Sequence, residues 1–240
     1  IFFVISGFVI TSSIAKEKSS NLLEFLIKFY EKRIKRLIPA LVFFVLTISI
    51  IICFFIPNPN KFLTIGIRAF FGLSNISFYR GSWDYFAVAS DLNPFMHTWS
   101  LGVEEQFYFI FPFIFWLTGF HKGTQRGTRN FYLTILFLFF ISLISFIFIY
   151  PINQPAAYFL MPFRFWEIAL GSLTFLFLKN SKNNLFDKFK NISPTLIFFI
   201  MVILMFLPLD FAIFSTILVV FLTSILLISL NNAKFLYVYL

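Results

Sequence analysis

Long apolar stretches alternate with short polar ones along almost the whole chain, and this pattern predicts membrane-spanning helices. A helix needs about 20 mostly apolar residues to cross the hydrocarbon core of a bilayer. Seven stretches approach that length, and the short ones would need tilting or local thinning of the bilayer. They are Ile1–Ile14, Leu37–Ile56, Glu104–Phe120, Phe131–Tyr150, Phe163–Leu178, Pro194–Leu207 and Phe211–Leu230. The pattern therefore predicts an all-α fold, a polytopic bundle of transmembrane helices.

The charges between these stretches predict which loops face the cytoplasm. Cytoplasmic loops of membrane proteins carry an excess of Lys and Arg. The loop from Lys16 to Arg36 contains seven such residues. Two later loops are marked by Lys122, Arg126 and Arg129 and by Lys179, Lys182, Lys188 and Lys190. These three loops should be cytoplasmic, whereas the uncharged stretch Pro151–Pro162 and the tight turn Pro208–Asp210 should face outward.

The segment Phe62–Tyr79 is apolar enough to resemble a span, but it contains Arg68 and two glycines. The loop assignments alternate correctly only if this segment does not cross. We therefore expect a re-entrant or surface helix within a long outer segment, Pro57–Val103. Irregular backbone at membrane depth is tolerated only where protein or water surrounds it, so this segment is a candidate region for a functional site.

The composition agrees with lipid as the solvent of this chain. Of its 240 residues, 60% are hydrophobic and 12% are charged, whereas soluble domains carry about 25% charged residues. The net charge of +9 lies in the loops, so topology explains it and no nucleic-acid partner is expected. The single cysteine, Cys53, cannot form an internal disulfide, and no His/Cys spacing is typical of a metal site. Neither a metal nor a bound cofactor is expected.

Both ends of the chain fall inside apolar stretches. Ile1 opens within one, and a new apolar run begins at Phe235–Leu240. We therefore expect one transmembrane domain, residues 1–240, that is truncated at both ends, with at least one span upstream.

The most distinctive polar cluster, His97–Tyr108, lies where the third apolar stretch begins. Ser100 could cap a helix, with Glu104 and Glu105 in its first turn, where acids complement the helix dipole. Capping does not explain a His, two acids and a Gln at this place, because ionisable groups at membrane depth are costly and usually functional. Glu104 and Tyr108, four residues apart, should share one helix face.

A second cluster, Arg33–Ala40, lies just before the second apolar stretch, with Pro39 expected in the first turn of that helix. One explanation is that Arg33 and Arg36 only mark the inner boundary of the membrane. The other is that they bind a ligand, because two arginines three residues apart could reach one phosphate, and Arg suits forked phosphate recognition. Charge alone leaves both explanations open.

Two further stretches combine polar and small residues. Arg164 and Glu167, three residues apart, could neutralise one another or line a polar pocket that opens outward. Gly171 would let a neighbouring helix approach closely, and Ser6-Gly7 is typical of tight helix packing. Ser6 as a nucleophile is a poorer explanation, because the sequence places no base beside it.

Two minor features complete the candidates. His121 lies in a basic loop, where we expect it to be solvated. The triplet Asn75-Ile76-Ser77 matches a glycosylation acceptor, as many chance triplets do.

The stretches that carry these clusters resemble motifs of the membrane acyltransferase-3 family, bacterial O-acyltransferases that modify surface polysaccharides. They are Phe2–Ile10, Arg33–Ala40, His97–Tyr108 and Arg164–Gly171, of which His97–Tyr108 is the most specific. The resemblance covers residues 1–175. It implies a bundle of about ten membrane helices, seven of them visible here, in the bacterial inner membrane as a multi-pass protein.

The resemblance also implies an activity. Members of the family transfer an acyl group, often acetyl, from a cytoplasmic acyl-CoA donor such as acetyl-CoA. The acceptor is a hydroxyl of a cell-surface polysaccharide, lipopolysaccharide among them, or of its lipid-linked precursor. The main base of the family is a His in its first helix, which would lie upstream of residue 1.

Site roles follow from the same resemblance and from the charges. Arg33 and Arg36 would bind the phosphates of the donor. The matched motif positions His97, Glu104 and Glu105 would have supporting catalytic roles. The acceptor side, or a polar passage to it, would be lined by Tyr108, Arg164 and Glu167. An enzyme should therefore join the Arg33/Arg36 end and the Glu104/Arg164 end in one continuous polar cavity.

Two other classes of protein remain as alternatives. A transporter or flippase of lipid-linked sugars would also need ionisable residues at depth, but such proteins often show inverted repeats, and no repeat is visible here. A structural membrane protein would tolerate substitution of His97, Glu104 and Arg164.

Overall fold

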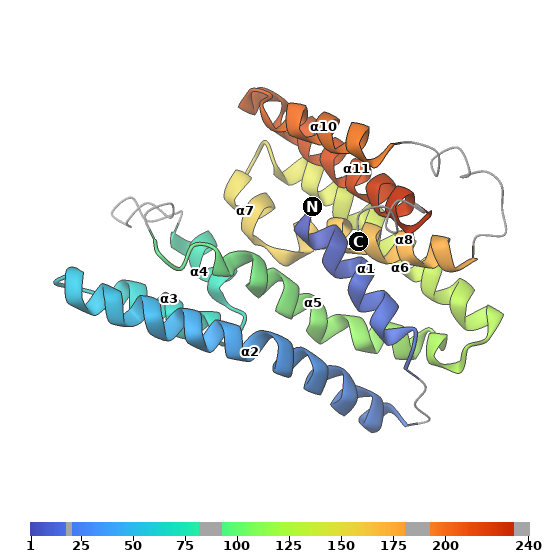
Figure 1. Ribbon diagram of the computed structural model, residues 1–240, viewed down its shortest axis with the longest axis horizontal. Coiled ribbons are helices and arrows are strands. Elements are labelled where there is room, and N and C mark those ends of the chain that lie inside the picture. The colour runs from blue at the N-terminus through green and yellow to red at the C-terminus, as the bar shows by residue number, and fades with distance from the viewer. Residues whose placement is uncertain (18–20, 82–92, 181–192, 233–240) are drawn as a thin grey trace. The chain divides into compact units, whose positions relative to one another are not determined.

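The computed structural model of the protein describes residues 1–17, 21–81, 93–180 and 193–232 (Figure 1). Within these ranges the regular structure is helical, without strands, which confirms the all-α prediction. The helices are α1 (Phe2–Ile14), α2 (Leu22–Phe55), α3 (Asn60–Ala69), α4 (Ser74–Gly81), α5 (Thr98–Leu117), η2 (Phe120–Lys122), α6 (Gln125–Ile149), α7 (Gln154–Phe159), α8 (Met161–Asn180), α10 (Pro194–Met205), η4 (Leu209–Phe211) and α11 (Ala212–Asn232).

Four helical stretches of the described chain are long and apolar enough to cross a membrane. They are Leu22–Phe55, Gln125–Ile149, Gln154–Lys179 and Ala212–Asn231, and Phe2–Ile14 and Pro194–Met205 are shorter apolar helices. The protein is therefore a multi-pass membrane protein, whereas the predicted number of seven spans is not confirmed. Part of the third basic loop, residues 182–190, lies outside the described residues.

The region before the second predicted span is helical, which corrects the predicted loop from Lys16 to Arg36. Helix α2 begins at Leu22, where the Asn21 side chain accepts a hydrogen bond from the backbone N–H of Leu23 (3.2 Å). Pairs of opposite charge one turn apart, Glu24–Lys28 and Glu31–Lys35, also favour helix there. Pro39 consequently lies inside the helix and not in its first turn.

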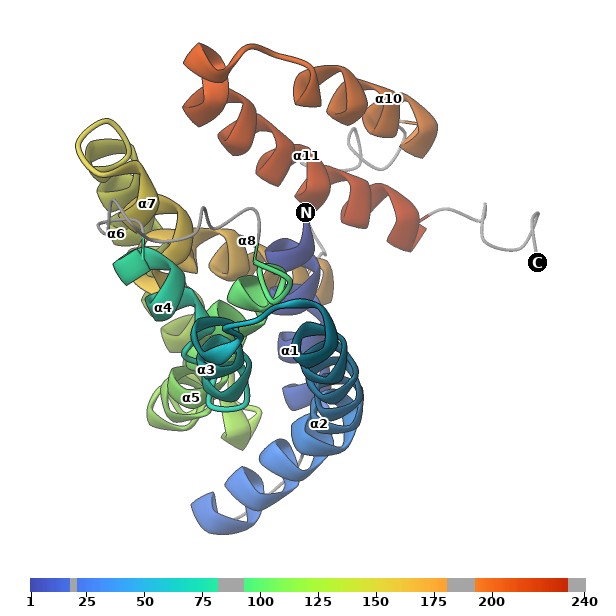
Figure 2. The same ribbon diagram turned by 90° about the vertical axis from the view of Figure 1, so that its left-hand side faces the viewer.

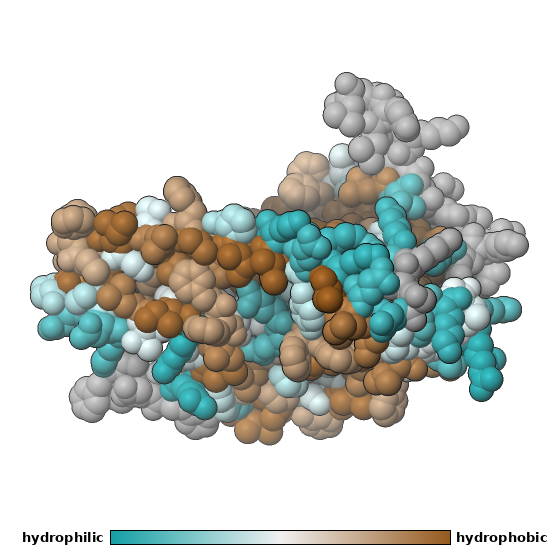
Figure 3. Space-filling view, turned by 90° about the horizontal axis from the view of Figure 1, so that it is seen from below, coloured by the Kyte–Doolittle hydropathy of each residue, from teal (hydrophilic) through white to brown (hydrophobic). Residues whose placement is uncertain are grey.

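The 34 residues of α2 make a helix about 51 Å long, which exceeds the roughly 30 Å hydrocarbon core of a bilayer. Its surface changes along its length. In Figure 3 hydrophobic side chains dominate the left, where the C-terminal half of α2 lies, and hydrophilic ones gather farther right. The helix therefore combines an apolar half with an amphipathic half.

The ambiguous segment Phe62–Tyr79 forms two short helices. α3 has 10 residues and α4 has eight, and the chain turns between them at Gly72, whose φ is +63°. Such a positive φ is strained for residues with a side chain. Each helix is too short to span a bilayer, and the re-entrant or surface position of the segment remains a prediction.

The chain divides into two compact units. The first contains Ile1–Lys16, Tyr132–Leu143 and Phe165–Leu240. In it, a Cβ on Gly7 would lie 2.0 Å from the carbonyl oxygen of Ile168, and a Cβ on Gly171 would lie 2.0 Å from that of Val4. The backbones of α1 and α8 thus touch at both glycines, which confirms the close packing predicted for them.

The same unit ends in the helix pair α10–α11. The two helices lie side by side and run in opposite directions in both ribbon views (Figures 1 and 2). They are joined by the short connection around η4, at the place of the predicted turn Pro208–Asp210.

The second unit contains Glu17–Phe131 and Ile144–Arg164. Phe25 near the start of α2 stacks on Phe115 near the end of α5 (centroids 5.2 Å apart), and Phe44 meets Phe95 just before α5 (6.1 Å). The start of α2 thus contacts the end of α5, and a later part of α2 contacts the residues just before α5. The two helices are therefore antiparallel. This register decides which polar residues of the two helices meet.

Candidate functional site

A buried polar cluster lies where α2 crosses the middle of α5. The Arg33 guanidinium carbon lies 5.1 Å from the centroid of the Tyr108 ring and 5.5 Å from that of the Phe29 ring. The Tyr108 hydroxyl donates a hydrogen bond to the Glu104 carboxylate. Arg33, Glu104 and Tyr108 are each at most 7% exposed. We call these three residues the buried cluster.

Helix geometry explains why these residues meet. Glu104 and Tyr108 are one turn apart and lie on the same face of α5, as predicted. The antiparallel register brings Arg33 opposite that face, and the Tyr30 hydroxyl donates to the Tyr108 carbonyl oxygen (3.4 Å), which fixes the two helices at this level. A buried guanidinium without a compensating charge would be very costly. The Glu104 carboxylate is the opposite charge near it, and the face of the Tyr108 ring lies against it.

The sequence-based prediction separated these residues by the thickness of the membrane. It placed Arg33 at the cytoplasmic mouth of one helix and Glu104 at the outer end of another. The structure places Arg33 in contact with Tyr108, the hydrogen-bond partner of Glu104. The physical reason is the early start of α2, which brings Arg33 alongside the middle of α5.

The Arg33 guanidinium is not saturated with hydrogen bonds. Its Nε is buried and has no hydrogen-bond partner among the described residues. Buried donors are rarely left unpaired, and an exception calls for an explanation such as a missing ligand. The Nε–H group can therefore donate one more hydrogen bond, to an oxygen atom of an anion or a carbonyl group.

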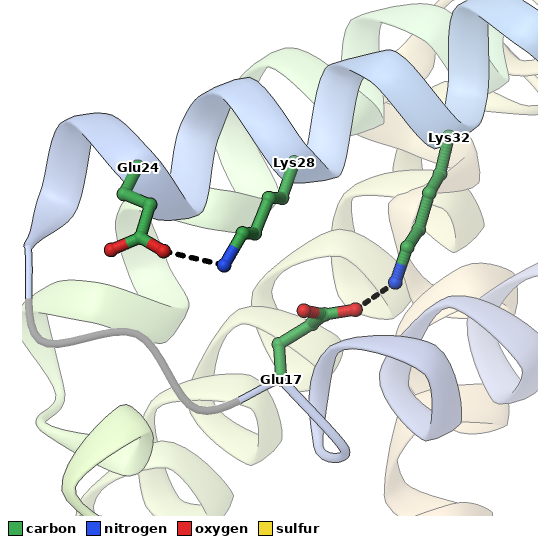
Figure 4. A network of polar contacts seen from close by, with 4 residues as sticks. All are labelled: Glu17, Glu24, Lys28 and Lys32. Carbon is green, nitrogen blue, oxygen red and sulfur yellow. Dashed lines mark hydrogen bonds and ion pairs between the residues drawn. The ribbon is translucent and has the colours of Figure 1, made fainter.

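The acidic residues around the N-terminal half of α2 pair with lysines. Glu17 pairs with Lys32 and Glu24 with Lys28, as Figure 4 shows. Lys35 is held by Glu31 in the same way. Arg36, which is exposed, has no ion pair with a carboxylate of the described chain, and neither has Arg33. The two arginines are thus the cations of this helix that can still bind an anion.

A second polar group joins α4 to α5. The Gln106 amide nitrogen donates to the carbonyl oxygen of Gly72 and to Asn75 Oδ1 (2.9 Å each). Asn75 Nδ2 in turn donates to the carbonyl oxygen of Phe159 at the end of α7 (3.0 Å). A Cβ on Gly102 would lie 2.9 Å from Asn75 Oδ1, so only glycine allows this close approach. We call Gln106, Asn75 and the groups they bind the amide clamp.

The amide clamp was missed by the sequence analysis. Asn75 is fully buried and is occupied by these bonds, so the glycosylation triplet has a structural explanation in this fold. The signal that could have revealed it is the presence of two amides in apolar surroundings, because buried polar groups are normally hydrogen-bonded.

Glu105 points to the turn between α3 and α4. A Cβ on Gly72 would lie 2.5 Å from Glu105 Oε2, so the half-buried carboxylate rests on the backbone of that turn. Adjacent helix residues diverge by about 100°, which explains why Glu104 joins the buried cluster and Glu105 does not.

The start of α5 differs from the prediction. The helix begins at Thr98, with His97 as its N-cap residue and without a side-chain capping bond. Ser100 lies inside the helix, where its hydroxyl donates to the His97 carbonyl oxygen (3.2 Å). Capping by Ser100 is therefore wrong, and Glu104 and Glu105 lie beyond the first turn, so helix capping does not explain them. His97 itself is exposed.

Arg164 is buried among aromatic rings. Its Nε donates to the carbonyl oxygen of Tyr158 (3.2 Å), and its guanidinium carbon lies 4.9 Å from the Tyr158 ring centroid. The rings of Phe146 and Trp99 lie 5.8 and 5.9 Å from the same carbon. Glu167 is buried too, but it belongs to the first unit, whereas Arg164 ends the second. The continuous polar cavity expected of an enzyme remains a prediction.

The prediction that His121 is solvated is wrong, because its side chain is half-buried. Its ring stacks on that of Trp116, with centroids 3.8 Å apart, in the short turn η2 between Gly119 and Gly123. Burial first, and the charge of Lys122 second, lower the pKa of His121. Among the described residues no three His, Cys, Asp or Glu are grouped so that they could hold a metal ion.

The sequence of this chain is similar to those of known proteins. Residues 1–237 match the family described as the acyltransferase domain. The chain is 38% identical over 180 residues to an uncharacterised protein of Haemophilus influenzae, a match that covers 72% of this chain and 71% of that protein. No solved structure matches the chain.

Two relatives whose names state an activity match a smaller share of this chain. O-acetyltransferase OatA of Staphylococcus aureus is 35% identical over 147 residues, or 60% of this chain and 23% of that protein. Peptidoglycan O-acetyltransferase OatA of Listeria monocytogenes is 37% identical over 113 residues, or 47% of this chain and 18% of that protein. The matched part spans less than a quarter of each of these two relatives.

Proposed function

The chain belongs to the acyltransferase-3 family, whose domain it matches over residues 1–237, and from this premise we propose that it is a membrane O-acetyltransferase of the cell envelope. In this proposal it transfers an acetyl group from cytoplasmic acetyl-CoA to a hydroxyl of a surface polysaccharide or its lipid-linked precursor. The names of the two OatA relatives support acetyl as the group. The Listeria relative is named for peptidoglycan, which favours peptidoglycan over lipopolysaccharide as the first acceptor to test.

The buried cluster is the observation that carries this proposal. In the reaction a hydroxyl oxygen attacks the thioester carbonyl, a C–O bond forms, and the C–S bond breaks. The hydroxyl proton goes to a base, and the thiolate leaves as a thiol after protonation. Negative charge develops on the carbonyl oxygen, and a preorganised donor in a water-poor site stabilises it. The unpaired Nε of Arg33 is such a donor.

The remaining roles follow from the charges around it. Glu104 and Tyr108 hold the Arg33 guanidinium in place, which gives them supporting roles. Arg36, three residues further along α2 and exposed, would bind a phosphate of the donor. His97 and Glu105, which the structure places outside the buried cluster, keep supporting roles toward the acceptor in this proposal.

The experiment uses the complete gene that encodes this chain. The protein is expressed in a host whose own enzymes of this family are deleted, and inside-out and right-side-out membrane vesicles are supplied with labelled acetyl-CoA. We expect label in the envelope polysaccharide only when the donor has access to the cytoplasmic face. Arg36→Ala and Glu104→Ala should lose the incorporation.

Lys35→Ala is the matched control for Arg36→Ala. Lys35 is the neighbouring exposed cation, but it already pairs with Glu31, so its removal should leave the transfer unchanged. Equal transfer by the parent and both site variants would reject the site. No transfer by a folded parent protein would reject acetyl-CoA as the donor.

A further inference from the structure

Four aromatic rings and one guanidinium form a compact group at the start of α5. The rings of Trp99 and Tyr158 lie 4.5 Å apart, and Phe159 contacts both, with centroids 5.8 and 4.9 Å away. Arg164 lies beneath, within 6 Å of the Trp99, Tyr158 and Phe146 rings. We call Trp99 and Tyr158, with Arg164 beneath them, the aromatic shelf.

The shelf is partly open to its surroundings. Tyr158 is 38% exposed and Trp99 is half-buried, whereas Phe159 and Arg164 beneath them are buried. Two rigid side chains are therefore held together with part of their surface exposed, and the Arg164 hydrogen bond to the Tyr158 carbonyl oxygen holds the backbone at Tyr158. The amide clamp also ties α7 to α4, because Asn75 donates to the carbonyl oxygen of Phe159.

The shelf joins two segments that are predicted to lie on the outer side of the membrane. Trp99 lies in the segment Pro57–Val103, and Tyr158 lies in the uncharged stretch Pro151–Pro162. The loop charges placed both segments outward. The structure brings these two segments into contact, although they are far apart in the sequence. In the proposed function the acceptor lies on that same side.

Sugars have the chemistry that suits such a surface. One face of a pyranose ring presents mostly C–H groups, which carry slight positive charge, while the face of an aromatic ring is negative. Binding sites of this kind combine aromatic rings with a small number of polar groups that fix orientation. Interfacial anchoring would also place Trp and Tyr at the bilayer boundary, and the experiment below distinguishes it from sugar binding.

We propose that the aromatic shelf binds a sugar ring of the acceptor glycan. This inference rests on the proposed function for the identity of the acceptor, and it adds Trp99 and Tyr158 as binding residues that hold the glycan by stacking. Arg164 is then a positioning residue, because it holds the Tyr158 segment in place and is itself buried.

The test measures binding without catalysis. The complete protein in lipid nanodiscs is titrated with soluble oligosaccharides released from the host's own peptidoglycan and from its other surface polysaccharides. We expect one of these probes to bind the parent protein. Tyr158→Ala should weaken binding at least tenfold, and Tyr158→Phe, which keeps the ring, should stay within twofold of the parent.

Tyr132→Ala is the matched control, since Tyr132 is 40% exposed and lies in α6 next to a predicted cytoplasmic loop. If exposed tyrosines act only as membrane anchors, the Tyr132 and Tyr158 variants should behave alike. The shelf proposal would be wrong if Tyr158→Ala bound glycan as the parent does, or if Tyr132→Ala lost binding to the same extent. It would also be wrong if the parent bound none of the probes.

The acetyl-transfer assay separates this inference from the proposed function. Transfer by the parent with an unchanged acceptor KM in Tyr158→Ala would overturn the shelf and leave the O-acetyltransferase. Glycan binding that is lost only in Tyr158→Ala, without transfer by the parent, would support the shelf and reject acetyl transfer from acetyl-CoA. We expect a raised acceptor KM in Tyr158→Ala, with the KM for acetyl-CoA unchanged.

Discussion

The helix pairs α1–α8 and α2–α5 differ in what lies at their contact. Between α1 and α8 there are two glycines, and each backbone touches the other through Gly7 and Gly171. Between α2 and α5 there are large aromatic rings and, in the middle, the charged groups of the buried cluster. In lipid, helices gain little from hiding apolar side chains from one another, so close packing and polar contacts decide their association.

The two contacts differ in what they offer beyond helix packing. The glycine contact needs only small residues and offers no reactive group. The buried cluster is more costly to build, because it removes a guanidinium and a carboxylate from water and leaves one donor unpaired. A contact that costs stability and keeps an unused donor is a better candidate for function than one that only packs.

The largest expected effect is on the glycine contact. Gly171→Val would place a side chain within 2.0 Å of the Val4 carbonyl oxygen, so α1 and α8 would have to separate. Overpacking typically costs about 1–3 kcal/mol and more where backbone must move. We expect little folded protein, measured as the monodisperse fraction and Tm in detergent.

Gly81→Ala provides the control for that substitution. A Cβ at Gly81 meets no atom of the described residues within 4 Å, and alanine is a better helix former than glycine, so this variant should keep or raise Tm. A stable Gly171→Val protein with parent-like Tm would mean that the α1–α8 contact is not as close as described.

The second prediction concerns the buried cluster. Arg33→Lys keeps the charge but loses the planar fork and the unpaired Nε, so the donor proposed to stabilise the carbonyl oxygen is lost. Loss of one such donor typically costs about 10²–10³ in rate. We expect at least a hundredfold loss of acetyl transfer in membrane vesicles, with Tm within a few degrees of the parent.

Lys32→Arg is the reverse exchange on the same helix and should leave the transfer unchanged, because Lys32 is exposed and pairs with Glu17. If Arg33→Lys transferred acetyl at the parental rate, the guanidinium would have no role beyond its charge, and the proposed stabilisation of the carbonyl oxygen would be wrong.

Much of the fold could be predicted from local patterns. Apolar stretches identified the long helices, and small residues identified the positions of close packing in α1 and α8 but not that these two helices are partners, because a pattern describes one segment at a time. The start of α2 could not be predicted in this way. Its first turns are amphipathic and rich in charge, so they resemble a basic loop when only hydropathy is considered, although the Glu–Lys pairs favour helix.

The candidate site was predicted less completely for a related reason. The sequence identified Arg33, Glu104 and Tyr108 individually, and helix periodicity placed Glu104 and Tyr108 on one face. Contact with Arg33 depends on the register between α2 and α5, which is a property of two segments packed together. The amide clamp has the same origin, because Asn75 and Gln106 are 31 residues apart.

A third and smaller effect is expected at the amide clamp. Gln106→Ala would leave the Gly72 carbonyl oxygen and Asn75 Oδ1 without a hydrogen bond that each now has. An unsatisfied buried polar group costs about 1–3 kcal/mol, so Tm should fall by several degrees. Gln154→Ala, which removes an exposed bond to Tyr150, should change Tm little. Equal shifts in the two variants would show that the clamp adds no stability.

The smallest effect is expected on the charged surface of α2. Glu24→Ala removes the partner of Lys28, a pair in which both side chains are more than 40% exposed. Such pairs one turn apart on a helix contribute about 0.3–0.5 kcal/mol, and salt screens them. Tm should therefore fall by about a degree at low ionic strength and not at all in 0.5 M salt. A large or salt-independent loss would instead mean that the first turn of α2 depends on Glu24 for more than this ion pair, as it would if the carboxylate also stabilised the helix N-terminus.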